Sequence, residues 1–167
     1  LGLRSAAAGQ RVRLILQASE LIKKQRLKWY QLVRPWPAHL AAQLSGPTTT
    51  WLIGPGSTVV LEPLAPELAE AHLHALMRGF VAALAQLQPL ACKTAFALLA
   101  QDGGEAKADP AGVYEGGFNT DGERDEHPGY RRYWPDYAAL SAAADFRSLT
   151  EQCYAPLFHH TPKTETL

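Results

Sequence analysis

Residues 48–61 read Thr-Thr-Thr-Trp-Leu-Ile-Gly-Pro-Gly-Ser-Thr-Val-Val-Leu, and this stretch decides the fold class. β-Branched and aromatic residues predominate in Thr48–Ile53 and Thr58–Leu61, and these residue types favour strands. Between the two runs, Gly54-Pro55-Gly56-Ser57 has the composition of a tight turn. The stretch therefore predicts a β-hairpin, and Pro63 predicts the end of its second strand.

Patterns typical of helices surround this hairpin. Pro35 and Pro37 place the start of the first helix near Trp36, because proline is tolerated in a first turn but not in a helix interior. The other predicted elements are a strand at Arg11–Gln17 and helices at Pro66–Leu87, Ala91–Gln101 and Tyr137–Phe158. This order predicts an α/β (α+β) fold, in which a small mixed sheet is flanked by helices.

Length and composition predict a single domain over residues 1–167. A chain of this size can bury a sufficient core without disulfides or metal, and 47% of its residues are hydrophobic. We expect an ordered core over residues 11–158, with frayed ends at residues 1–10 and 159–167. No apolar stretch is long enough for a membrane span, so no membrane partner is expected.

The formal net charge of zero conceals an asymmetry along the chain. Residues 1–40 carry eight basic side chains and one acidic side chain, whereas the remainder carries eight basic and fifteen acidic side chains. A basic arm on an acidic body suits contact with nucleic acid or an acidic partner, and a solvated strand and loop is the alternative of equal weight. The candidate nucleic-acid-binding residues are Lys23, Lys24, Arg26, Lys28 and Trp29.

The sequence offers no convincing catalytic or metal-binding constellation. A nuclease of the restriction-endonuclease type needs acids on a hairpin and Asp/Glu-x-Lys on its second strand, but Glu62 stands alone and Leu64 occupies the position of the lysine.

The acidic residues within 121–126 lack the spacing of a calcium loop and are expected to form a solvated loop. Cys92 and Cys153 are expected as buried free thiols in a reducing cytoplasm. We therefore predict no catalytic residue, no metal and no cofactor.

Aromatic residues mark two further places in the chain. His39 follows Trp36 by one helical turn, so the two side chains can touch, and we favour a packing or capping role for His39. Near the C-terminal end, tyrosine, tryptophan and arginine are the usual anchors of protein interfaces, and simple core packing is the alternative for the aromatic residues. The candidate partner-interface residues there are Tyr130, Arg131, Arg132, Tyr133 and Trp134.

A family resemblance extends over roughly 130 residues, in order and spacing. The segments that carry it are Leu32–Leu40, which reads Leu-Val-Arg-Pro-Trp-Pro-Ala-His-Leu, then Trp51–Gly54, Val59–Leu64, Ala69–Pro89, Lys107–Gly116, Gly122–Glu126, Tyr130–Trp134 and Ala155–Phe158. Together they resemble the C-terminal domain of the RecC family, the gamma chain of exodeoxyribonuclease V (RecBCD).

The resemblance implies a fold like the restriction-endonuclease core without its catalytic residues. It also implies a domain that is not an enzyme by itself and that acts in a bacterial, cytoplasmic helicase-nuclease. The implied partners are RecB-type and RecD-type subunits, with DNA reached through the complex during double-strand-break repair and recombination. Two alternatives stay open, namely an active metal-dependent nuclease with an unrecognised site and a protein-interaction module without DNA contact.

Overall fold

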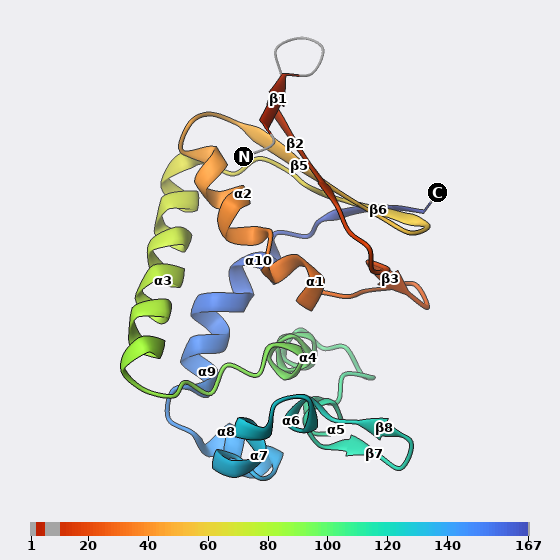
Figure 1. Cartoon of the computed structure of the whole chain (residues 1–167), viewed down its shortest axis with the longest axis vertical. Helices are drawn as coiled ribbons and strands as arrows, with labels where there is room; N and C mark the ends of the chain where they lie inside the picture. The colour runs from red at the N-terminus through yellow and green to blue at the C-terminus, as the bar shows by residue number, and fades with distance from the viewer. Residues whose placement is uncertain (1–2, 6–10, 167) are drawn as a thin grey trace. The chain divides into compact units, whose positions relative to one another are not determined.

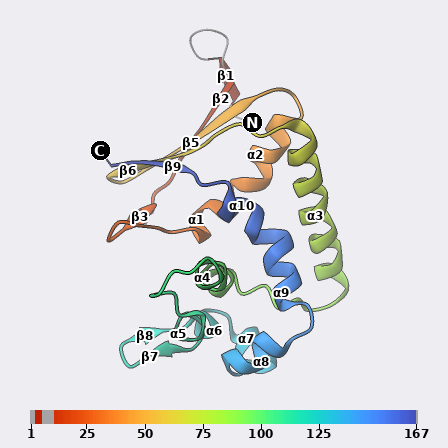
Figure 2. The ribbon, with the colours of Figure 1, turned by 180° about the vertical axis from the view of Figure 1, so that it is seen from behind.

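The computed structural model describes residues 3–5 and 11–166, and the chain forms two compact units. The sheet unit comprises residues 1–76 and 159–167, and the helical unit comprises residues 77–158. Figures 1 and 2 show the elements of each unit from two sides. The prediction of a single domain stays a prediction, because compactness does not show whether the two units fold independently.

The sheet unit is built on a five-stranded sheet with the order β1-β2-β5-β6-β9 (Figure 1). Its strands are β1 (Leu3–Ser5), β2 (Arg11–Leu16), β5 (Thr48–Gly54), β6 (Ser57–Leu61) and β9 (Lys163–Thr166). β2 runs parallel to β5, whereas the other neighbouring pairs are antiparallel. The predicted hairpin is confirmed as β5 and β6. The mixed sheet with its helices confirms the predicted fold class, while the likeness to a restriction-endonuclease core stays a prediction.

Two short helices and a second hairpin complete the first part of the sheet unit. They are β3 (Ile22–Lys23), β4 (Arg26–Leu27), α1 (Tyr30–Val33) and α2 (Trp36–Gln43). Figures 1 and 2 show α1 and α2 on the same side of the sheet. Helix α2 begins at Trp36, as the flanking prolines predict. The segment between β2 and α1 belongs to the predicted basic arm, and in the structure it contains the hairpin of β3 and β4.

Helix α3 (Pro66–Ala85) confirms the helix predicted over Pro66–Leu87 and continues from the sheet unit into the helical unit. Its apolar stripe is only partly covered. Ala69 is its one buried residue, and the side chains of Phe80 and Leu84 are 66% and 73% exposed. Helical periodicity therefore predicts the element correctly but not the degree of its burial.

The helical unit contains short elements around a small core. They are α4 (Cys92–Asp102), α5 (Pro110–Glu115), β7 (Gly116–Gly117), β8 (Thr120–Asp121), α6 (Glu123–Glu126), α7 (Pro128–Tyr133), α8 (Tyr137–Ala142), α9 (Phe146–Leu149), a π-helix (Thr150–Tyr154) and α10 (Ala155–His159), whose last residue belongs to the sheet unit. One cluster of its buried residues comprises Ala91, Leu98, Tyr114, Leu140 and Phe146.

The prediction of one continuous helix over Tyr137–Phe158 is wrong. Ala143 takes an extended conformation and ends α8, and α9 begins at Phe146. Further on, Pro156 has no N–H to donate to the preceding turn, and the backbone widens into a π-helix just before it. Helical periodicity persists through both interruptions, which is why the sequence indicates a single helix.

Both chain ends contribute strands to the sheet. Leu3–Ser5 pairs with β2, and Lys163–Thr166 pairs with β6. Residues 1–2, 6–10 and 167, which belong to the predicted frayed ends, lie outside the described residues. The polar sequence of β9 suggested a tail, but alternating charged and polar residues are also typical of an edge strand. Among the helices that the structure describes, none has the length and apolarity needed to cross a bilayer.

Candidate docking and nucleic-acid surfaces

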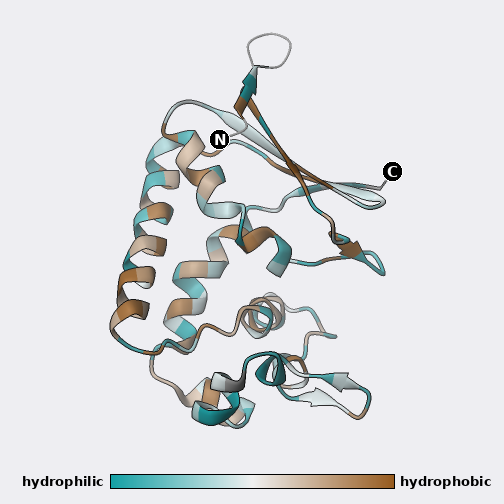
Figure 3. Ribbon diagram, viewed as in Figure 1, coloured by the Kyte–Doolittle hydropathy of each residue, from teal (hydrophilic) through white to brown (hydrophobic). Residues whose placement is uncertain are grey.

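Three of the five predicted nucleic-acid-binding residues lie together at the tip of the hairpin formed by β3 and β4. The strands pair in register, which leaves Lys24 and Gln25 as a two-residue turn. The side chains of Lys23, Lys24 and Arg26 are exposed, and Figure 3 shows this tip as hydrophilic. Three cations within four residues can contact successive backbone phosphates. The set Lys23, Lys24 and Arg26 is called the basic tip below.

The turn of this hairpin is strained. Lys24 has φ of 49° and Gln25 has φ of 61°, so two residues with side chains occupy the left-handed region. Hairpin turns of this hand favour Asn-Gly, and each non-glycine residue there costs on the order of 1 kcal/mol. The base of the hairpin is held firmly, because Leu21 is completely buried and its carbonyl accepts a hydrogen bond from the Lys28 N–H at 2.8 Å.

The other two predicted nucleic-acid-binding residues lie at the base of the hairpin. Lys28 is only 19% exposed, and its Nζ is 3.2 Å from Oε2 of Glu20. Trp29 is half-buried where α1 begins. The structure therefore separates the predicted set into an exposed basic tip and a partly covered base.

The predicted partner surface also divides into two parts. The Tyr130 hydroxyl donates to the Leu90 carbonyl at 3.0 Å, and the Trp134 carbonyl accepts from the Tyr114 hydroxyl at 2.7 Å. Both aromatic rings pack against the core of the helical unit, and burial raises the pKa of Tyr130 to about 12. Tyr130 and Trp134 thus pack against the core, which corresponds to the alternative to an interface role.

The exposed part of the predicted partner surface lies on α7. Tyr133 is 60% exposed, and the side chains of Arg131 and Arg132 are exposed as well. An Arg131 nitrogen lies 3.3 Å from Oδ1 of Asp125, a surface ion pair that orients the side chain and adds little stability. The side chains of Arg131, Arg132 and Tyr133 are therefore accessible to a partner. Tyr130 and Trp134 anchor α7 and the residue after it to the core of the helical unit.

A buried polar cluster joins α2 to the sheet. The rings of Trp36 and His39 stack with centroids 5.4 Å apart, which confirms the predicted contact. Nδ1 of His39 lies 2.9 Å from the Thr50 hydroxyl. Burial is the main reason that the pKa of His39 falls to about 4, and the nearby side chains of His160 and Arg13 lower it further. His39 is therefore neutral at physiological pH and serves packing.

The hairpin of β5 and β6 was the place where nuclease carboxylates would be expected. Glu62 follows β6, and its Oε1 lies 2.6 Å from Nζ of Lys163. This single carboxylate is paired with an ammonium group. Within residues 3–5 and 11–166, no three His, Cys, Asp or Glu side chains gather in a way that could hold a metal ion.

Glu123 is the main residue whose role the sequence did not reveal. It was expected in a solvated acidic loop, but its side chain is buried. Its carboxylate accepts hydrogen bonds from the backbone N–H of Lys93 at 2.9 Å and from the N–H and hydroxyl of Thr94, each at 2.8 Å. Glu123 therefore caps the start of α4, where Ala91 offers no capping side chain. The solvated-loop prediction is wrong for this residue.

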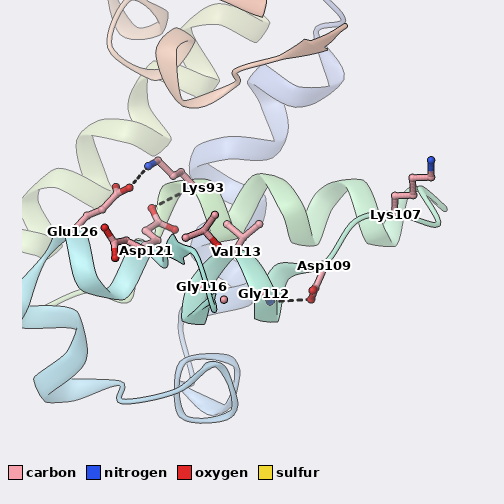
Figure 4. A pocket seen from close by; sticks show the side chains of 11 residues that line it. Lys93, Lys107, Asp109, Gly112, Val113, Gly116, Asp121 and Glu126 are labelled. Carbon is pink, nitrogen blue, oxygen red and sulfur yellow. Dashed lines mark hydrogen bonds and ion pairs between the residues drawn. The ribbon is translucent and has the colours of Figure 1, made fainter. Parts of the chain in front are cut away.

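A shallow pocket of about 520 Å³ lies beside this cap, within the helical unit. Figure 4 shows Lys93 facing Glu126, with Asp121 next to Glu126 and Lys107 extending away from them. Three of the charged residues that line the pocket already have partners. Lys93 is paired with Glu126, and the carboxylate of Glu123 caps α4. Asp121 lies on the hairpin strand β8 and is exposed.

Comparison with known protein families matches residues 3–103 to the RecC C-terminal domain. The chain belongs to the RecC C-terminal domain family. This membership implies a role as part of a RecBCD complex. No curated protein matches the chain. The family match includes the sheet strands β1, β2, β5 and β6, the basic tip, α3 and α4, whereas residues 104–167 lie beyond it.

Proposed function

We propose that this RecC C-terminal domain is a non-catalytic scaffold that joins RecB-type and RecD-type subunits and guides DNA in the cytoplasm. The family match over residues 3–103 carries the proposal. In this role the domain supports a helicase-nuclease in double-strand-break repair and recombination, and the chemistry of cleavage belongs to other parts of the complex.

The basic tip supplies the DNA contact in this proposal. Lys23, Lys24 and Arg26 are exposed on a short hairpin whose base is fixed by the buried Leu21. Among the residues that the structure describes, Lys23 and Lys24 form no ion pair, so their charge is available to phosphates. Such contacts hold a nucleic-acid strand without reading its sequence.

Assembly and DNA binding can be tested with the same preparation. The full-length protein is co-expressed with RecB-type and RecD-type subunits from the same source, and the complex is isolated by size-exclusion chromatography. We expect a stable complex whose affinity for DNA falls steeply as salt rises. The protein alone, incubated with linear DNA and Mn²⁺, is expected to leave the DNA intact.

Each alternative has its own outcome in this experiment. Sustained cleavage by the isolated protein that stops when a chelator is added would show an active nuclease. Assembly with a DNA affinity that the basic tip does not affect would show a protein-interaction module without DNA contact. Failure to assemble with either subunit would contradict the scaffold role itself.

A further inference from the structure

The hairpin of β7 and β8 presents a large apolar side chain to solvent at its tip. Gly116 pairs with Asp121 and Gly117 with Thr120, so Phe118 and Asn119 form a two-residue turn. Phe118 is fully exposed, more than any other large hydrophobic residue described. Single exposed apolar residues are common on surfaces, but a phenylalanine with no covered area, held at the end of a hairpin, requires a specific explanation.

The hairpin is fixed in place by close backbone packing. Gly116 has φ of 78°, a region that favours glycine. A Cβ added at Gly122 would collide with the carbonyl oxygen of Tyr114, whose ring is buried in the core. Immediately after Gly122, the buried carboxylate of Glu123 binds the first turn of α4. Phe118 therefore projects from a rigid support, and little conformational entropy is lost when a partner receives it.

The charges around Phe118 distinguish between the possible partners. Residues 109–126 contain six acidic side chains and one basic side chain, Arg124, which donates to the Pro135 carbonyl at 2.7 Å. Asp109, Asp121, Asp125 and Glu126 are among the acidic residues of this segment, and Asp121 and Glu126 are exposed. Glu126 is paired with Lys93 and Asp125 with Arg131, which leaves Asp121, next to the turn, as an exposed acid with no ion pair among the described residues. Its carboxylate repels phosphates, so stacking of Phe118 on a nucleic-acid base is disfavoured. The same carboxylate attracts lysine and arginine on a protein.

We propose that the β7–β8 hairpin is a protein-docking element, in which Phe118 enters an apolar pocket of a partner subunit whose rim carries lysine or arginine. The exposed carboxylate of Asp121, beside the turn, meets these basic residues. Aromatic anchors that fill a pocket dominate the binding energy of many interfaces, and charged rims set orientation and association rate. The inference rests on the proposed assembly with partner subunits and names the surface that serves it.

The test measures binding of the full-length protein to purified RecB-type subunit and, separately, to RecD-type subunit. Phe118→Ala is expected to weaken binding to one of them by roughly 30-fold, as for an interface anchor. Phe118→Trp retains most of the binding, and Asp121→Lys weakens it, more strongly at low salt. Asn119→Ala is the matched control in the same turn and stays within about twofold of the unchanged protein. Thermal unfolding of all four variants is expected to be unchanged, because these side chains are exposed.

Other occupants of the hairpin give different results. Loss of DNA affinity in Phe118→Ala, with subunit binding intact and tighter DNA binding by Asp121→Lys, would identify nucleic acid as the partner and overturn the inference. Self-association that Phe118→Ala abolishes, without effect on subunit binding, would identify a second copy and also overturn it. Equal subunit binding by Phe118→Ala and Asn119→Ala rejects this inference alone. If the unchanged protein binds neither subunit, the proposed function fails and the inference fails with it.

Discussion

Each unit contains a hairpin with a two-residue turn, and the two hairpins differ in charge and in the way their turns are fixed. β3 and β4 carry the basic tip on a turn with two strained residues, held by the buried Leu21 at its base. β7 and β8 carry Phe118 in acidic surroundings, held by glycine packing at Gly116 and Gly122. The same local structure thus carries a different charge at its tip in each unit, and we expect the two tips to attract different partners.

The first prediction concerns the packing that fixes the β7–β8 hairpin. Gly122→Ala is expected to lower the free energy of unfolding by about 4 kcal/mol, because the added methyl group collides with the Tyr114 carbonyl. Gly117→Ala is the control, since its Cβ would meet only the Thr120 hydroxyl, at 3.4 Å. Urea unfolding of the two variants measures the difference. Equal stability of both variants would show that close packing does not fix this hairpin.

The second prediction concerns acid stability of the sheet unit. Folded His39 has a pKa of about 4, whereas the ordinary value of 6.5 applies when the chain is unfolded. The unfolded state therefore binds a proton first, and stability that is complete above pH 6.5 is lost as the pH falls towards 4, by roughly 3 kcal/mol. Burial also lowers the pKa of His160, which acts in the same direction.

Urea unfolding between pH 7.5 and pH 4.5 tests this acid dependence. His39→Gln removes one titrating group, so its stability is expected to vary less with pH than that of the unchanged protein. His74→Gln, at an exposed position on α3, is the control and keeps the full dependence. A pH dependence that is the same in both variants would contradict the role given to His39.

The third prediction concerns the charge of the basic tip. Replacing Lys23, Lys24 and Arg26 by alanine is expected to reduce the slope of log affinity against log salt by about 1 for each phosphate that the protein no longer neutralises. Replacing Arg131 and Arg132 on α7 by alanine removes two positive charges away from the basic tip and serves as the control, compared per charge removed. A DNA-binding slope that drops equally in both variants would mean that overall charge, rather than this hairpin, attracts DNA.

The smallest expected effect concerns the strain in the same hairpin. Gln25→Gly is expected to raise the free energy of unfolding by about 1 kcal/mol, because glycine adopts the left-handed conformation without steric cost. The charge of the tip does not change, so DNA affinity is expected to stay within about twofold. Reduced stability of Gln25→Gly would show that the turn is held in another conformation.

The elements that the sequence predicts well are those with a local signal. The hairpin of β5 and β6 follows from β-branched runs around Gly54-Pro55-Gly56, and α2 begins at Trp36 because of its flanking prolines. The sequence did not predict the hairpin that carries the basic tip, because Lys24-Gln25 lacks the glycine or asparagine that usually marks such a turn. Its cations were nevertheless recognised, since charge is visible in the sequence without knowledge of the turn.

The features that the sequence did not reveal depend on contacts between distant residues. Glu123 caps N–H groups 29 and 30 positions earlier in the chain, so its neighbours give no sign of the role. Phe118 is apolar, and composition alone favours burial for such a residue, although the structure leaves it in solvent. Within the predicted partner surface, the sequence could not separate Tyr133, which is exposed, from Trp134, which packs against the core.

Photo-crosslinking from the two tips tests most directly the claim that charge assigns each hairpin its partner. A benzoylphenylalanine is placed at position 23 or at position 118 of the full-length protein, and each complex with RecB-type subunit, RecD-type subunit and DNA is irradiated. We expect position 23 to capture DNA and position 118 to capture a protein subunit. Capture of DNA from position 118, or of protein alone from position 23, would contradict it.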